Sequence, residues 1–352
     1  MTATQPRGGV RVQVVLVALA VTVSTSACGD GTDTARRAPA RLIAAVEDLA
    51  DSTGGGISVA VIRGGGDTEL VSAGDASRDS SRAVDGATSF RVASVTKTYL
   101  ATTTLMLVDD GRLALDASLG SLFDEPGDWG DVTVRQLLGH TSGLPRSGPR
   151  LDPTTWRNPA DIRLDPLCAP GTCRNYADEN YVVAGLVIER VTGSPLERAL
   201  RDRILTPLGL HRTFLEPAEQ ATPPIAEHPA RPVWKPLPGV VTNAEDLARF
   251  GRALFGGDLL SDGSLRAMLD FAATGDLPCA DDCEMPPRYG LGVIGYADLL
   301  PCEVWGHDGS TGAFLAYVQS TETVIAVVTN VEPWPEDFGP SIVAAATDGA
   351  CA

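Results

Sequence analysis

Hydrophobic positions predict strands at both ends of the chain. Two short runs, at residues 56–66 and 68–74, have strand character and are joined by a glycine-rich turn. Four more runs of this kind occur towards the C-terminus, at residues 288–296, 302–307, 313–320 and 323–331. Because consecutive strands are connected by short turns, we expect them to form an antiparallel sheet.

Apolar residues at helical spacing predict helices before, between and after these strands. Short helices are expected at residues 40–49 and 341–350, near the two ends of the fold. Ser94 opens another predicted helix, which runs to Val108 and has Gly111 as its C-cap residue.

The middle of the chain, roughly residues 112–270, is predicted to be a helical and loop-rich insertion. Residues 181–193 have helical apolar spacing, and a further helix begins with a capping box, Thr242 to Glu245, and stops at a double glycine. The whole pattern predicts an α/β fold of the α+β type in one domain, residues 39–352. An antiparallel sheet would be flanked by N- and C-terminal helices, with a helical subdomain beside it.

The first residues predict an export signal. Arg7 and Arg11 precede an apolar run that is short for a membrane span, and small residues follow it. We expect residues 1–27 to be removed, Cys28 to become a lipidated first residue, and residues 28–38 to form a polar tether. The protein would then be anchored at the outer face of the cell membrane. Plain secretion is the alternative.

The composition is that of an ordinary globular protein, with 352 residues of which 43% are apolar and 21% charged. The formal net charge of −17 argues against nucleic acid as a partner, because nucleic-acid binding requires a basic surface. Contact with a membrane is expected only through the lipidated N-terminus.

Cysteine counting predicts disulfides. Seven cysteines are present, and setting Cys28 aside leaves six, an even number in an exported protein. Local pairing predicts the bridges Cys168–Cys173, Cys279–Cys283 and Cys302–Cys351. A zinc site at the second pair is the rival, but no histidine lies nearby in the sequence. His140, His211 and His228 also lack metal-ligand spacing and are expected to be structural, so no metal or other cofactor is expected.

Lys97 is one of only two lysines in a chain with 28 cationic side chains. It lies three residues after Ser94, so on a helix the two side chains share one face. Unlike an arginine, a buried lysine can lose its proton and act as a base, which makes the pair a candidate for an activated nucleophile. The N–H groups at a helix start would favour negative charge on a reacting oxygen. A solvated surface lysine is the alternative.

Two further segments carry candidate chemistry. Tyr176 and Asp178 precede a predicted helix, and a tyrosine near an ammonium can shuttle a proton. The sequence HDGS at residues 307–310 follows a predicted strand, and its glycine would let the backbone approach a ligand closely. The N–H groups of Ser310 and Ser94 could then form an oxyanion hole. A packing tyrosine and a simple glycine turn are the structural alternatives.

Together these segments resemble the penicillin-recognising serine hydrolases, a family that includes class C β-lactamases and D-alanyl-D-alanine carboxypeptidases. The family's motifs are S-x-x-K, Y-x-N and K-T-G or H-x-G, and here they read SVTK, YAD and HDG in the same order. The flanking segments LLGHTSGLP, PGT, GLVIERVTG and EDLARFGRAL match as well. The resemblance covers about residues 55–350 and is greatest to the H-x-G branch, the secreted actinomycete carboxypeptidases.

This resemblance implies the β-lactamase/DD-peptidase fold and a covalent acyl-enzyme. Ser94 would attack a carbonyl carbon, while Lys97 and Tyr176 handle its proton. The backbone amides of Ser94 and Ser310 would hold the oxyanion. The implied substrate-binding residues are Asp178, His307, Asp308, Gly309 and Ser310. The implied substrates are cell-wall peptides that end in D-Ala, or β-lactams.

Two residues depart from the family's pattern. Asp178 stands where asparagine is usual, and an ionised carboxylate cannot donate a hydrogen bond and would stabilise protonated Lys97. Asp308 stands where threonine or glycine is usual, and would repel a substrate carboxylate unless its side chain turns away. An esterase or D-aminopeptidase of the same family is therefore an alternative. A slow-turnover penicillin-binding or sensing protein is an alternative from another class.

Overall fold

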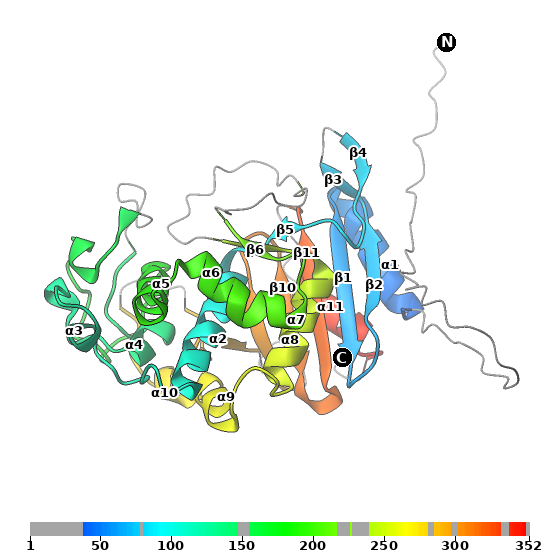
Figure 1. Ribbon diagram of the computed structural model, residues 1–352. Coiled ribbons are helices and arrows are strands. Elements are labelled where there is room, and N and C mark those ends of the chain that lie inside the picture. Colours follow the sequence, from blue (N-terminus) through cyan, green and yellow to red (C-terminus); the bar gives the residue numbers. More distant parts are fainter. Residues whose placement is uncertain are drawn as a thin grey trace, which may run out of the picture.

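A six-stranded antiparallel sheet forms the centre of the structure (Figure 1). The computed structural model describes residues 38–77, 80–146, 155–216, 226, 239–280, 285–296, 302–331 and 338–349. The strands lie in the order β2 (Glu69–Ala73), β1 (Ile57–Arg63), β11 (Thr323–Thr329), β10 (Phe314–Val318), β9 (Val304–Asp308) and β8 (Ile294–Gly295). Strands from the two ends of the chain pair at the centre, where Ala60 lies opposite Ala326.

The strand at the edge of the sheet is shorter than its sequence suggests. Residues 288–296 are predicted as one strand, but only Ile294 and Gly295 pair with β9. Gly292 has a φ of +79°, which breaks the extended conformation. A Cβ at Gly290 would lie 2.0 Å from the carbonyl oxygen of Met268, so only glycine fits this close approach. The segment therefore turns before it pairs.

Helices cover both faces of the sheet. On one face, α1 (Ala40–Thr53) and α11 (Phe338–Ala346) pack on residues such as Val59. On the other, α8 (Ala244–Phe255) packs on Ala60. Successive residues of a strand point to opposite faces, so β1 contributes to two apolar cores, one on each side. The expected antiparallel sheet with flanking helices is confirmed.

A mainly helical region lies beside the sheet (Figure 1). Its helices are α2 (Thr96–Asp109), α3 (Leu119–Leu122), α4 (Val134–Leu138), α5 (Glu179–Thr192), α6 (Leu196–Leu200), α7 (Thr206–Leu208), α9 (Asp262–Met268) and α10 (Ala272–Gly275). Short helical turns occur at η1 (Ala93–Val95), η2 (Gly127–Trp129), η4 (Pro159–Asp161), the π-helical η5 (Arg201–Leu205) and η6 (Gln319–Thr321). Two small sheets pair β3 (Asp75–Ser77) with β4 (Ser80–Ala83), and β5 (Phe90–Arg91) with β7 (Val240–Thr242) and β6 (Phe214–Leu215).

Helix α2 is buried on nearly all sides at its N-terminal end. The hydroxyls of Thr102, Thr103 and Thr104 donate to the carbonyl oxygens four residues earlier, at 2.7, 2.9 and 2.8 Å. These bonds satisfy polar groups that would otherwise be costly to bury. Helix α2 can therefore be buried at these threonines without unpaired hydroxyl groups.

The capping box predicted at Thr242 and Glu245 is wrong by one residue. Asn243 caps α8 instead, since its Oδ1 accepts the N–H of Asp246 at 3.0 Å. Thr242 ends β7, and its hydroxyl lies 2.7 Å from that of Thr213. Threonine and asparagine both favour the cap position, so strand pairing decides between them.

Cys168 and Cys173 form the predicted disulfide, with Cα atoms 6.1 Å apart. Cys279 and Cys302 each take part in a disulfide as well. The cysteines predicted to pair with these two lie outside the described residues, so both pairings stay predictions.

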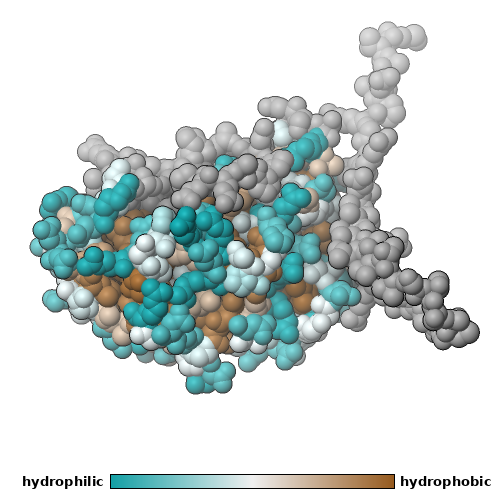
Figure 2. Space-filling view, in the orientation of Figure 1, coloured by the Kyte–Doolittle hydropathy of each residue, from teal (hydrophilic) through white to brown (hydrophobic). Residues whose placement is uncertain are grey.

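The predicted signal peptide and Cys28 also lie outside the described residues. Within the described ranges, none of the helices has the length and apolarity needed to cross a bilayer. Hydrophilic side chains cover much of the face shown in Figure 2, and apolar ones appear mainly between them. Among the described residues Leu167 is the one large hydrophobic side chain that is exposed.

Candidate active site

Ser94 lies in the turn η1, which leads directly into α2. Ala93 before it has a φ of +44°, in a region that residues with a Cβ rarely adopt. A Cβ at Gly309, after β9, would lie 2.3 Å from the carbonyl oxygen of Val92. The Thr311 hydroxyl donates to the carbonyl oxygen of Arg91 at 2.7 Å. The end of β9 and the Ser94 turn are therefore locked together.

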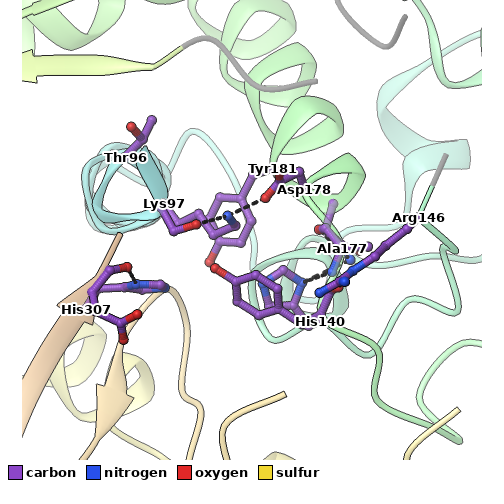
Figure 3. A network of polar contacts seen from close by, with 12 residues as sticks. Thr96, Lys97, His140, Arg146, Ala177, Asp178, Tyr181 and His307 are labelled. Carbon is purple, nitrogen blue, oxygen red and sulfur yellow. Dashed lines mark hydrogen bonds and ion pairs between the residues drawn. The ribbon is translucent and has the colours of Figure 1, made fainter. Parts of the chain in front are cut away.

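Lys97 is 1% exposed and brings the predicted residues together. Its Nζ donates to Ser94 Oγ at 2.9 Å and to Asp178 Oδ1 at 2.5 Å. Figure 3 shows the Lys97 and Asp178 side chains pointing toward each other. The centre of the Tyr176 ring lies 4.7 Å from the same Nζ. The S-x-x-K and Y-x-D segments, far apart in the sequence, thus meet at one buried amine.

The pKa of Lys97 is raised above its ordinary value. Burial is the largest single influence and would lower the pKa, but Tyr176 and then Asp178 together outweigh it. Lys97 is therefore an ammonium in the resting site. The expectation that Lys97 gives up its proton to act as the base stays a prediction, and this direction of the pKa does not favour it.

The loop that contains His140 holds the Tyr176 segment in place. The Asn175 N–H donates to the carbonyl oxygen of His140 at 2.9 Å, and the Ala177 N–H lies 3.3 Å from His140 Nδ1. The Asn180 amide lies 3.1 Å from the same nitrogen. The sequence predicts a structural role for His140, although its GHTSGL loop sets it apart from the other histidines, and it gives no signal at Asn180. The GHTSGL segment was the available signal, but its contacts with the helix α5 were not readable from spacing.

Lys97 Nζ lies beside a cluster of five aromatic rings. They belong to Tyr176, Tyr181, Tyr289, His140 and His307. His307 Nδ1 is 2.7 Å from the carbonyl oxygen of Asp308, and its Nε2 is 3.2 Å from the Tyr289 hydroxyl. Because a carbonyl oxygen can only accept, the proton of neutral His307 is on Nδ1, and Nε2 accepts from Tyr289.

The Asp308 carboxylate is held by a phenol. Its Oδ1 accepts the Tyr296 hydroxyl at 2.8 Å. Asp308 pairs with Phe314 and His307 pairs with Leu315 across β9 and β10. Phe314 and Leu315 belong to the two different cores, so the Asp308 and His307 side chains leave β9 on opposite faces. The Asp308 carboxylate therefore lies on the face of β9 opposite to the His307 ring.

Ser310 is exposed in the turn after β9. Its backbone N–H makes no hydrogen bond within the described part of the chain. Ser94 lies in the first turn of a helical segment, where N–H groups have no intrahelical acceptor. Both N–H groups are therefore free to receive an oxygen atom.

Known proteins with a similar sequence belong to the family that the sequence motifs predict. The family described as Beta-lactamase matches residues 42–347. The chain belongs to the beta-lactamase family. Penicillin-binding protein 4 of Amycolatopsis lactamdurans is 31% identical to this family member over 309 residues, which are 75% of this chain and 78% of that one.

Solved structures give the same fold. The D-stereospecific amidohydrolase from Streptomyces sp. matches this beta-lactamase family member with a TM-score of 0.70 and 26% identity, over 88% of this chain and 99% of that one. The D-amino acid amidase from Ochrobactrum anthropi SV3 has a TM-score of 0.74 at 24% identity, over 88% and 98%, which shows the fold alone. The predicted family and fold are confirmed, and the protein is a serine hydrolase.

The two buried histidines of this beta-lactamase family member predict a loss of stability in acid. Burial lowers the pKa of His140 well below its usual range. Burial also lowers the pKa of His307 to about 4, although the Asp308 charge opposes this. In the unfolded chain both titrate near about 6.5, so the unfolded state binds more protons between about pH 6.5 and 4. The free energy of unfolding should therefore fall with pH in that window, by up to about 1.4 kcal/mol per unit for each histidine.

Urea unfolding followed at pH 7.5, 6.5, 5.5 and 4.5 measures this slope. His140→Asn should reduce the slope, whereas His211→Gln, at an exposed position, should leave it unchanged. A free energy of unfolding that stays constant from pH 6.5 to 4.5 would show that neither histidine is kept neutral by the fold.

Proposed function

We propose that the protein hydrolyses cell-wall peptides that end in D-Ala, or β-lactams, through an acyl-enzyme on Ser94. The observation that carries this proposal is the buried Lys97 ammonium, 2.9 Å from Ser94 Oγ and beside the Tyr176 ring. A serine, a buried cation and a phenol at a helix start supply a nucleophile, charge stabilisation and a proton carrier. The name of the penicillin-binding relative supports the same substrates.

In the proposed acylation, Ser94 Oγ attacks the carbonyl carbon of the scissile amide. Its proton passes to Tyr176, because Lys97 is already protonated and so cannot accept it. For that step the Tyr176 oxygen must enter as the proton acceptor, beside the Lys97 ammonium. Tyr176 then delivers the proton to the leaving nitrogen as the C–N bond breaks. The backbone N–H groups of Ser94 and Ser310 would hold the oxyanion.

Deacylation reverses the roles. A water molecule gives a proton to Tyr176 and attacks the ester carbon, and Tyr176 returns that proton to Ser94 Oγ as the C–O bond breaks. Lys97 stays charged throughout and stabilises negative charge on either oxygen. No metal or cofactor enters any of these steps.

Asp178 favours a second candidate function. One of its oxygens binds Lys97, yet the side chain is 36% exposed at the edge of the site. A carboxylate there offers no donor to a substrate carbonyl, but it would attract a substrate ammonium. An ester substrate does not need the missing donor, and a D-amino acid amide carries an ammonium. An esterase or D-aminopeptidase activity is therefore the alternative.

Intact-mass measurement during incubation with benzylpenicillin tests these proposals, with Ser94→Ala as the control. Rapid loss of penicillin without a lasting adduct would identify a β-lactamase. A persistent adduct on the wild type alone would identify a carboxypeptidase or a slow-turnover penicillin-binding protein, and release of D-Ala from a D-Ala-D-Ala peptide would separate these two. If no adduct forms and no penicillin is lost, the penicillin proposal is contradicted. The next substrates to test are then p-nitrophenyl esters and D-amino acid amides.

We also propose that the protein is exported and anchored at the outer membrane face through lipidated Cys28, after removal of residues 1–27. The Cys168–Cys173 disulfide supports an oxidising compartment. Metabolic labelling with an alkyne fatty acid should mark the wild type and not Cys28→Ser. Equal labelling of the two would contradict the anchor.

A further inference from the structure

His140 is buried beside the catalytic residues in an unusual conformation. Its side chain is 1% exposed and its φ is +57°, a left-handed conformation that few non-glycine residues adopt. Such conformations persist where surrounding contacts hold them, and they cluster at functional sites. Figure 3 places His140 between Arg146 and the Lys97–Tyr181 side of the site, with its ring bonded to the backbone of Ala177.

A chain of hydrogen bonds fixes the orientation of the Asn180 amide. The Ser142 hydroxyl accepts the Leu144 N–H at 3.0 Å and donates to Asn180 Oδ1 at 2.6 Å. The amide nitrogen of Asn180 donates to the carbonyl oxygen of Ala177 at 3.3 Å, and a carbonyl oxygen can only accept. This leaves the NH₂ group of Asn180 directed at His140 Nδ1, at 3.1 Å. The Ala177 N–H is directed at the same nitrogen. Two donors therefore meet at Nδ1, which must be unprotonated, and the proton of His140 lies on Nε2.

The His140 ring packs against the ring of Tyr176. Their ring centres lie 4.4 Å apart with planes tilted by 37°. Tyr289 and Tyr181 surround the same imidazole, with ring centres at 4.9 and 5.3 Å. His140 Nε2 is buried without a hydrogen-bond partner among the described residues, a cost that a purely structural position would avoid with an apolar side chain.

We propose that His140 is a positioning residue for the reaction. It accepts the Ala177 and Asn180 N–H groups at Nδ1 and presents its ring face to Tyr176, so that the phenol stays beside the Lys97 amine. This inference rests on the proposed role of Tyr176 in proton transfer. A phenylalanine would supply the ring without the acceptor, and an asparagine the acceptor without the ring. Histidine supplies both.

The surroundings require this imidazole to stay neutral. Burial lowers the pKa of His140, and it is lowered further by positive charge on Lys97 of α2, on His307 of β9 when that ring is protonated, and on Arg146 of the following loop. Protonation would also remove the acceptor at Nδ1. The new Nδ1–H would then face the N–H groups of Ala177 and Asn180, which are donors too. His140 therefore positions Tyr176 over the whole working pH range and does not transfer a proton itself.

A double-mutant cycle between His140→Asn and Tyr176→Phe tests the inference. Asparagine keeps the acceptor and tolerates the left-handed backbone, so the variant retains the loop while it loses the ring. The readout is the burst rate of Ser94 acylation by p-nitrophenyl acetate, a general ester probe. Tyr176→Phe should lower this rate about 10²-fold or more, the usual effect of a lost proton carrier. His140→Asn should lower it about tenfold to a hundredfold in the wild type, and about twofold or less in the Tyr176→Phe background.

The cycle separates positioning from general structural support. Equal rate losses in both backgrounds would show that His140 does not act through Tyr176, and this would overturn the inference. No effect of Tyr176→Phe would instead overturn the proposed role of Tyr176, and the inference with it. Should His140→Asn fail to fold, Asn180→Ala offers a second cycle, since it removes one Nδ1 donor and keeps the ring.

Nitrogen-15 NMR of the imidazole gives an independent readout. We expect an unprotonated Nδ1 and a protonated Nε2, without titration between pH 5.5 and 8. A protonated Nδ1, or titration within this range, would overturn the inference whatever the rates are.

Discussion

Lys97→Arg is expected to lower the acylation rate of Ser94 by about 10³-fold, although the substitution conserves the charge. Lys97 is 1% exposed, and its Nζ contacts both Ser94 and Asp178 within 3 Å. A guanidinium is planar, larger than an ammonium and carries five donors in a fixed fork. It cannot keep both contacts in a space bounded by the rings of Tyr176 and Tyr181, so the nucleophile and the phenol would be displaced.

Single-turnover acylation by p-nitrophenyl acetate measures this loss. Lys97→Met, which removes the charge at similar length, should be at least as slow as the arginine variant. Arg266→Lys, an exchange of the same two cations at an exposed position on α9, is the matched control, with an expected rate like that of the wild type. An arginine variant within tenfold of the wild type would mean that a positive charge is sufficient and that the geometry at Nζ is not required.

Local spacing predicts the Ser94–Lys97 contact because helical periodicity is set by the sequence itself. Both residues lie at the start of one helical segment, so a separation of three brings them together in any fold. The resemblance to known hydrolases placed the candidate Tyr176 in the same site as Ser94, which no periodicity could do. The antiparallel sheet was also predictable, since short turns link its C-terminal strands.

The sequence alone does not decide the proton state of Lys97, since burial favours the neutral amine and Asp178 favours the ammonium. That state depends on the balance between burial, which lowers the pKa, and Tyr176 and Asp178, which raise it. Likewise, the sequence could not show that Tyr296, at the end of the neighbouring strand β8, is the partner of Asp308. Cross-strand neighbours depend on register, and the segment around β8 was itself predicted as a longer strand.

Gly309→Ala is expected to lower the acylation rate by roughly 10²–10³-fold, the usual effect of losing one oxyanion donor. A Cβ at this position would lie 2.3 Å from the carbonyl oxygen of Val92 and 3.2 Å from the Cβ of Ala93. The nearer atom belongs to the backbone, so no side-chain rotation can relieve the clash. The end of β9 would have to move away from the Ser94 turn, and the N–H of Ser310 would move with it.

The same displacement would cost about 1–3 kcal/mol of stability, so rates should be compared at a temperature where both proteins are folded. Gly275→Ala is the matched control, because its Cβ meets no atom within 4 Å and its position in α10 favours alanine. That control should keep the wild-type rate. A Gly309→Ala protein that is less stable yet acylates at the wild-type rate would show that the Ser310 N–H does not hold the oxyanion. The close approach of β9 to the Ser94 turn would then serve folding alone, and another donor would have to stabilise the transition state.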